Sequence, residues 1–198
     1  MIWILILFYS LFYFIIRKFI EKKYRIKELS EEMKKFYESS LKGKDISKLD
    51  EKALSKYYEF IQNFSKYYMT ITIVSIVTFL VYIYMFSFSY NLDIKDNSTV
   101  ISINNPILSY STFYLVYNNT ALGFYNSENG KIFIDKVIED KKLLNLYIVV
   151  FKLPFNIPLL NKNWIGYIFT YIIFLLLIDL SYYLINRLKN KFIKSIHK

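Results

Sequence analysis

The chain has 198 residues, of which 55% are hydrophobic and 20% aromatic, yet 21% are charged and the formal net charge at pH 7 is +10. It contains no cysteine, and its single histidine, His197, lies next to the C-terminal residue, which argues against disulfides, thiolate metal sites and histidine-based catalytic or zinc sites. Apolar and charged residues are segregated into blocks, and this distribution is typical of a membrane protein.

Three apolar stretches are long enough to cross a membrane. We expect transmembrane helices at residues 1–19, 69–90 and 164–186, each close to the roughly 20 apolar residues that a bilayer core requires. The first stretch lacks the basic start and the small-residue cleavage site of a secretory signal peptide. The sequence therefore predicts an all-α polytopic membrane protein with three spans.

The distribution of basic residues predicts the orientation, because Lys and Arg near the ends of spans are retained on the cytosolic side. Such residues crowd the exits of the first and third spans: Arg17, Lys18, Lys22, Lys23, Arg25, Arg187, Lys189, Lys191 and Lys194. We therefore expect a multi-pass plasma-membrane protein with its N-terminus outside and a basic cytosolic tail at 187–198. Charge on the cytosolic side could also attract anionic lipid or ribosomal RNA.

Residues 20–68 predict a cytosolic antiparallel coiled-coil hairpin, because apolar side chains recur at spacings of three and four residues in two stripes. The predicted seam is Ile26, Leu29, Met33 and Phe36 from the first helix and Leu49, Ala53, Tyr57 and Phe60 from the second. No proline occurs before residue 106, so each span is expected to continue into its hairpin helix. The hairpin could bind a partner, or it could equally be a passive stalk or an oligomerisation element.

Residues 91–163 are expected outside as a small β-containing cap. This segment holds all three prolines, the turn signals "NNP", "YNNT" and "SENG", and β-rich runs such as "TVISI" and "LLNLYIVVFKL". Asn97 and Asn118 each begin an N-glycosylation pattern. The segment shows no metal-ligand cluster and no pairing of a nucleophile with a base.

Polar residues interrupt the predicted spans, and an ionised carboxylate such as Asp179 costs about 2.5–3.5 kcal/mol at the centre of a bilayer. At 1.5 Å per residue, Asp179 and Arg17 fall at similar depths in the cytosolic half of the membrane. We predict that the polar faces of the three spans converge on a wet groove that opens to the cytosol and to lipid. Its predicted lining is Thr72, Ser75, Thr78, Asp179, Arg17 and Ser10.

A second interpretation stays open at this point. Ser and Thr hydroxyls can bond carbonyls of their own helix, and Asp179 can lie in the interface among tyrosines. A proton or ion relay is disfavoured, because the spans offer one acid and no histidine.

Taken together, the chain resembles the YidC/Oxa/Alb membrane-insertase superfamily, and more narrowly its three-span archaeal YidC-like members. The order of span, hairpin, span, external segment and span is similar. Residues 25–61, "RIKELSEEMKKFYESSLKGKDISKLDEKALSKYYEFI", are similar in style to the family hairpin. Residues 151–174, "FKLPFNIPLLNKNWIGYIFTYIIF", are similar to the proline-containing approach to its last span.

The resemblance implies an insertase or chaperone whose partly hydrophilic groove receives nascent hydrophobic segments from the cytosolic side. Implied partners are nascent membrane proteins, a ribosome bound through the basic hairpin and tail, the lipid bilayer and a further membrane subunit. Bacterial relatives have five core spans, so this groove must be more open or completed by a partner. The arginine of the bacterial groove lies inside the membrane, whereas Arg17 ends the first span.

Two alternative functions are a receptor subunit for tail-anchored proteins, which shares the three-span hairpin plan, and a membrane signalling or scaffold protein with an external sensor cap. We expect no enzyme, metal or cofactor, because the chain has no P-loop, no G-x-S-x-G and no H-E-x-x-H motif.

Overall fold

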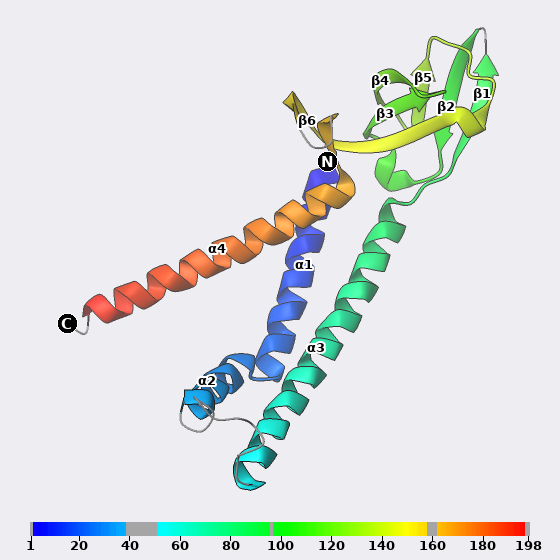
Figure 1. Ribbon diagram of the computed structural model, residues 1–198. Helices are drawn as coiled ribbons and strands as arrows, with labels where there is room; N and C mark the ends of the chain where they lie inside the picture. The colour runs from blue at the N-terminus through cyan, green and yellow to red at the C-terminus, as the bar shows by residue number, and fades with distance from the viewer. Residues whose placement is uncertain (1, 39–50, 96, 158–161, 197–198) are drawn as a thin grey trace. The chain divides into compact units, whose positions relative to one another are not determined.

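The computed structural model describes residues 2–38, 51–95, 97–157 and 162–196 (Figure 1). The described part is about 58% helix and 29% strand, with the strands in two antiparallel sheets. The prediction of an all-α fold was therefore wrong. The segment expected as a small cap folds into seven strands, so the protein combines helices with a substantial β domain.

The α-helices among the described residues are α1 (Ile2–Lys23), α2 (Ile26–Phe36), α3 (Glu51–Phe86) and α4 (Tyr167–Ile196). By length and composition, α1, α3 and the part of α4 from Tyr167 to Lys189 could each cross a membrane. Their exposed side chains are mostly large and apolar. This exposure suits a hydrocarbon environment and would be unfavourable in water.

The helical path is interrupted between α1 and α2 at Arg25, which adopts the left-handed conformation with φ of 50°. The Tyr24 and Arg25 amides close the end of α1 onto the Ile20 and Lys22 carbonyls, each at 3.0 Å. The Arg25 guanidinium then pairs with Glu28 in the first turn of α2. The expected continuous run from the first span into the first hairpin helix is thus interrupted, whereas α3 runs unbroken from hairpin to span.

The predicted hairpin seam comes together where α2 packs on the first turns of α3. Phe36 and Phe60 are 8% and 3% exposed, and their ring centroids lie 5.8 Å apart. Four further predicted seam residues pack around this pair: Leu29, Met33, Ala53 and Tyr57. Ile26 is half-buried, and Leu49 lies outside the described residues.

The β domain contains two antiparallel sheets. The first has the order β1 (Tyr90–Lys95), β2 (Ser98–Ile103), β5 (Lys131–Ile134). The second has the order β4 (Thr120–Asn126), β3 (Thr112–Tyr117), β6 (Leu144–Ile157), β7 (Lys162–Gly166). Two short 3₁₀ helices, η3 (Pro106–Leu108) and η4 (Lys141–Leu143), connect the strands.

Alternation of buried and exposed residues builds the core of this domain. Along β2, β3 and β5, every second side chain is buried in most of the strand, as expected when one face of a strand meets the core. The fully buried residues include Ile101, Phe113, Leu115 and Ile132. Thr99 is also buried, and its hydroxyl donates to the Lys136 carbonyl at 2.8 Å while it accepts from the Ile138 amide.

The β domain shortens both neighbouring predicted spans. The second span was expected to reach Tyr90, but α3 ends at Phe86 and Tyr90 begins β1. The third span was expected from residue 164, but Trp164 pairs with Lys152 in the sheet and α4 begins at Tyr167. An apolar aromatic run fits a buried strand as well as a helix, which explains the shifted boundary.

Candidate functional site

The predicted groove residues fall in two compact units of the chain. Residues 12–80 form one unit and hold Arg17, Thr72, Ser75 and Thr78. Residues 1–11 and 81–198 form the other, which holds Ser10 and Asp179. Convergence of Asp179 with the first four residues therefore stays a prediction.

Ser75 is the predicted residue with the clearest contact across helices. Its hydroxyl lies 2.6 Å from the Tyr13 hydroxyl of α1, and it also donates to the Ile71 carbonyl of its own helix at 2.7 Å. Because the Ser75 proton is used on Ile71, Tyr13 is the donor to Ser75. The Tyr13 oxygen keeps lone pairs that can accept further hydrogen bonds.

The next turns of α1 carry charge. The Arg17 Nε lies 3.2 Å from Glu21, four residues later on the same helix, and Lys18 lies 2.6 Å from the same carboxylate. Tyr67 of α3 is buried, and the charges of Arg17 and Glu21 both act on its hydroxyl group. Two cations thus share one anion, which leaves this part of the helix pair net positive.

A second tyrosine, Tyr24, connects the turn that follows α1 to α3. The Tyr24 hydroxyl lies 2.9 Å from Thr70 of α3, whose hydroxyl donates to the Lys66 carbonyl at 2.8 Å. Tyr24 therefore donates to Thr70 by the same reasoning. Its ring also meets the Tyr67 ring edge-on, with centroids 6.0 Å apart.

These contacts define a polar strip, a name used below for the following residues of α1, α3 and the turn after α1: Tyr13, Arg17, Glu21, Tyr24, Tyr67, Thr70 and Ser75. On α1 the strip runs from Tyr13 to Glu21, a rise of about 12 Å. It links helices that could each cross a membrane, and it offers tyrosine oxygens as acceptors in otherwise apolar surroundings. Together with the neighbouring Lys18, it also carries a net positive charge.

The chain shows no detectable similarity to a known protein family. No protein-family model, no characterised protein and no solved structure matches the chain. Any function must therefore be argued from the residues themselves.

The remaining predicted groove residues have simpler surroundings. The Ser10 and Thr78 hydroxyls are buried and donate to the carbonyls of Ile6 and Val74 on their own helices, at 2.8 Å and 2.5 Å. This is the local bonding that the second interpretation of the sequence expected. Thr72 is exposed, and Asp179 is half-buried on α4 and has an interaction partner.

Sequence reasoning missed Glu21, Tyr24, Tyr67 and Thr70. A signal existed on α1, where Tyr13, Arg17 and Glu21 recur every four residues and therefore share a face. The partners on α3 could not be found in this way, because pairing between helices depends on their register. Within the described residues, no group of three or more acidic, His or Cys side chains could hold a metal ion.

A buried tyrosine cluster was also missed, and it lies in the other compact unit. Tyr82 is fully buried, and its hydroxyl donates to the Tyr167 carbonyl at 2.7 Å. Its ring stacks on Tyr171 with centroids 4.5 Å apart and contacts Tyr9 at 5.3 Å. These rings fill space, and the buried Tyr82 hydroxyl is hydrogen-bonded, so we assign the cluster to packing.

Proposed function

We propose that the protein is a membrane-embedded insertase or chaperone that receives nascent hydrophobic segments from the cytosolic side. The observation that carries this proposal is the polar strip between α1 and α3, next to the hairpin of α2 and α3. A purely structural pair of spans gains little from tyrosine acceptors and a cationic centre along its contact, since polar groups in hydrocarbon are costly.

The polar strip would act by lowering the cost of bringing the polar flank of a substrate into the membrane. Peptide N–H groups can donate to the Tyr13 and Tyr24 oxygens, and acidic or carbonyl groups can meet Arg17 and Lys18. The driving force would be the apolar segment of the substrate, at about 25 cal/mol per Å² of surface removed from water. No nucleotide chemistry is required for such a step.

Site-specific photo-crosslinking tests this proposal in membranes that carry stalled ribosomes with a nascent membrane protein. Probes at Thr72 and Ser75 should capture the nascent chain. Ile73 is the matched control, because it is exposed on the same helix and points about 160° away from Ser75 at nearly the same depth. Capture at Thr72 and Ser75 well above capture at Ile73 supports the proposal.

Two results would count against insertion. Equal capture at Ser75 and at Ile73 would mean that the nascent chain contacts the helix only from the surrounding lipid. Crosslinks to lipid alone would mean that no nascent chain reaches this site. Repeating the experiment with released tail-anchored substrates separates the receptor alternative, which predicts capture without a ribosome.

A signalling or scaffold role is the second candidate, and the folded β domain favours it. A domain with two sheets and its own core is larger than a connection between two spans requires. Deleting residues 91–163 with a short linker should leave nascent-chain capture intact if insertion is the function. Loss of capture with retained membrane insertion of the variant would favour a role centred on the β domain.

A further inference from the structure

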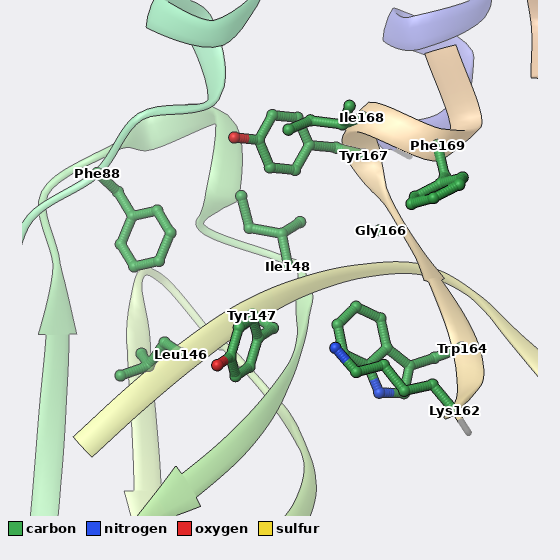
Figure 2. A pocket seen from close by; sticks show the side chains of 10 residues that line it. All are labelled: Phe88, Leu146, Tyr147, Ile148, Lys162, Trp164, Gly166, Tyr167, Ile168 and Phe169. Atoms are coloured by element: carbon green, nitrogen blue, oxygen red, sulfur yellow. The ribbon is translucent and has the colours of Figure 1, made fainter. Parts of the chain in front are cut away.

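A cavity of about 360 Å³ lies where the second sheet meets the first turn of α4. Figure 2 shows Tyr147 and Trp164 on the sheet side, Tyr167 and Phe169 on the helix side, and Phe88 from the segment that follows α3. All of these residues belong to one compact unit. The polar strip lies in the other unit, so this cavity is a separate feature of the chain.

The position of the cavity along the chain points to the membrane boundary. Phe88 follows the last residue of α3 by two positions, and Tyr167 to Phe169 form the first turn of α4. Both helices are long and apolar enough to span a bilayer. Phe169 is 52% exposed, and Trp and Tyr rings are enriched at membrane–water interfaces. The cavity is therefore expected where the two helices leave the hydrocarbon.

Lys162 places a single positive charge at the rim of this cavity. Its Nζ lies 4.9 Å from the centroid of the Trp164 ring and 5.3 Å from that of Tyr147, so cation–π attraction holds it over the aromatic wall. Among the described residues, no carboxylate lies within 4.0 Å of it. The lining combines apolar and aromatic surface with one cation, Lys162, which forms no ion pair with a described acidic residue.

We infer that this cavity holds one anionic phospholipid of the outer leaflet, with hydrocarbon against the aromatic wall and the phosphate at Lys162. The volume is near the lower end of the roughly 300–1,000 Å³ of ligand pockets, so it accommodates part of one acyl chain. The apolar lining disfavours a polar solute, and the lone cation favours a negatively charged headgroup. The inference rests on the proposed membrane embedding and is independent of insertion activity.

Lipid retention by the full-length protein tests this inference. The protein is reconstituted in nanodiscs of equal phosphatidylglycerol and phosphatidylcholine, released, and examined by native mass spectrometry for bound lipid. We expect phosphatidylglycerol to be retained over phosphatidylcholine by about fivefold, because one lysine near an anionic surface contributes about 1 kcal/mol.

Three variants make the measurement specific. Lys162→Gln should bring the ratio of the two lipids close to one. Lys131→Gln, the same change at an exposed residue of β5 in the other sheet, should leave it unchanged. Leu146→Trp places a large ring in the cavity and should reduce retention of both lipids. If that variant fails to fold, the lysine pair still decides the question.

An unchanged lipid ratio in Lys162→Gln would overturn the inference, as would wild-type retention in a folded Leu146→Trp protein. Capture of a nascent hydrophobic segment by a photo-crosslinker at Tyr147, in place of lipid, would overturn it too and would assign the cavity to substrate. Because lipid retention is measured without substrate or ribosome, failure of insertion activity would not affect the result.

Discussion

Hydroxyl side chains within the spanning helices differ in what they bond. Ser10 donates to a carbonyl of its own helix, whereas Ser75 and Thr70 also accept from tyrosines on the α1 side. A hydroxyl that bonds a carbonyl of its own helix satisfies its hydrogen bond locally and does not connect two helices. A hydroxyl that also accepts from a tyrosine joins two helices and defines the polar strip.

A double-mutant cycle on Tyr13 and Ser75 measures this link. Tyr13→Phe and Ser75→Ala each remove the contact at 2.6 Å, and we expect a coupling free energy of about 0.6 kcal/mol, the average for hydrogen bonds between membrane helices. Unfolding in mixed micelles gives the four stabilities. The control pair Ser10→Ala and Ser75→Ala should show no coupling, and coupling of the same size there would mean that the cycle does not report the contact.

Gly130 controls the turn between β4 and β5. It has φ of +76° and follows Asn129 at φ of 51°, and the Glu128 and Lys131 backbones exchange hydrogen bonds across the turn. This is a type I′ turn, which requires positive φ at both central positions. A Cβ at Gly130 would also lie 3.2 Å from the Ile103 carbonyl oxygen.

We therefore expect Gly130→Ala to destabilise the β domain by about 1–2 kcal/mol, the usual cost of left-handed backbone for a residue with a Cβ. The thermal unfolding midpoint of the strand signal in the full chain is the measurement. Asn129→Gly is the matched control and should be close to neutral, because glycine accepts the same backbone angles. A neutral Gly130→Ala would show that the turn relaxes to another type.

At the scale of elements, α2 depends on α3 for its stability. Eleven residues are too few for an isolated helix in water, and the left-handed residue Arg25 separates α2 from α1. The apolar face of α2 meets α3 chiefly through Phe36 on Phe60. The hairpin is thus a small cooperative unit that could open without unfolding the spans.

Phe60→Ala should open this unit selectively. Removing a buried phenylalanine costs about 3–5 kcal/mol in a well-packed core. This cost exceeds the free energy that we expect to hold one short helix such as α2 against α3. Hydrogen exchange in full-length protein should show loss of protection along α2, with protection of α4 unchanged. Tyr58→Ala, two positions away on a residue that is 60% exposed, should leave α2 protected; equal exchange in both variants would mean that the aromatic pair does not hold the hairpin.

The sequence pattern predicted elements well where one physical signal dominated. Apolar length indicated α1, α3 and α4, and the run "TVISI" at 99–103 falls within β2. The turn signals "YNNT" and "SENG" are turns in the structure, with Asn118 and Asn129 at positive φ. Each of these signals is local, so no tertiary information was needed.

Other features depended on contacts that the pattern does not contain. The break at Arg25 uses a left-handed residue that is neither Gly nor Asn, which no turn signal marks. Trp164 was assigned to a helix because its neighbours are apolar, yet it packs against Tyr147 and Tyr114 in a sheet. Within the candidate site, Ser75 and Arg17 were predicted, and Tyr13 shares the α1 face with Arg17. Which residues of α1 and α3 meet depends on the register of the two helices, which the sequence pattern does not contain.

At the scale of the whole molecule, the chain alternates between segments suited to lipid and segments suited to water. The hairpin of α2 and α3 exposes Lys and Glu, and the β domain has a conventional core with polar hairpin turns. Along the chain, α3 leads from the hairpin to the β domain, and the exposed residues of the three candidate spans are almost entirely apolar. If these helices span a membrane, the hairpin and the β domain must lie on opposite sides of it.

Single cysteines test this topology without background, because the chain has no cysteine of its own. Ser30 of α2 and Asn145 of β6 are both exposed, and changing either to cysteine leaves the net charge unchanged. In intact cells, a membrane-impermeant maleimide should label Asn145→Cys and spare Ser30→Cys, and inverted vesicles should give the reverse, because basic residues retain the hairpin in the cytosol. Labelling of both sites in intact cells would contradict the spanning arrangement, and the exchanged pattern would invert the direction from which a substrate could reach the polar strip.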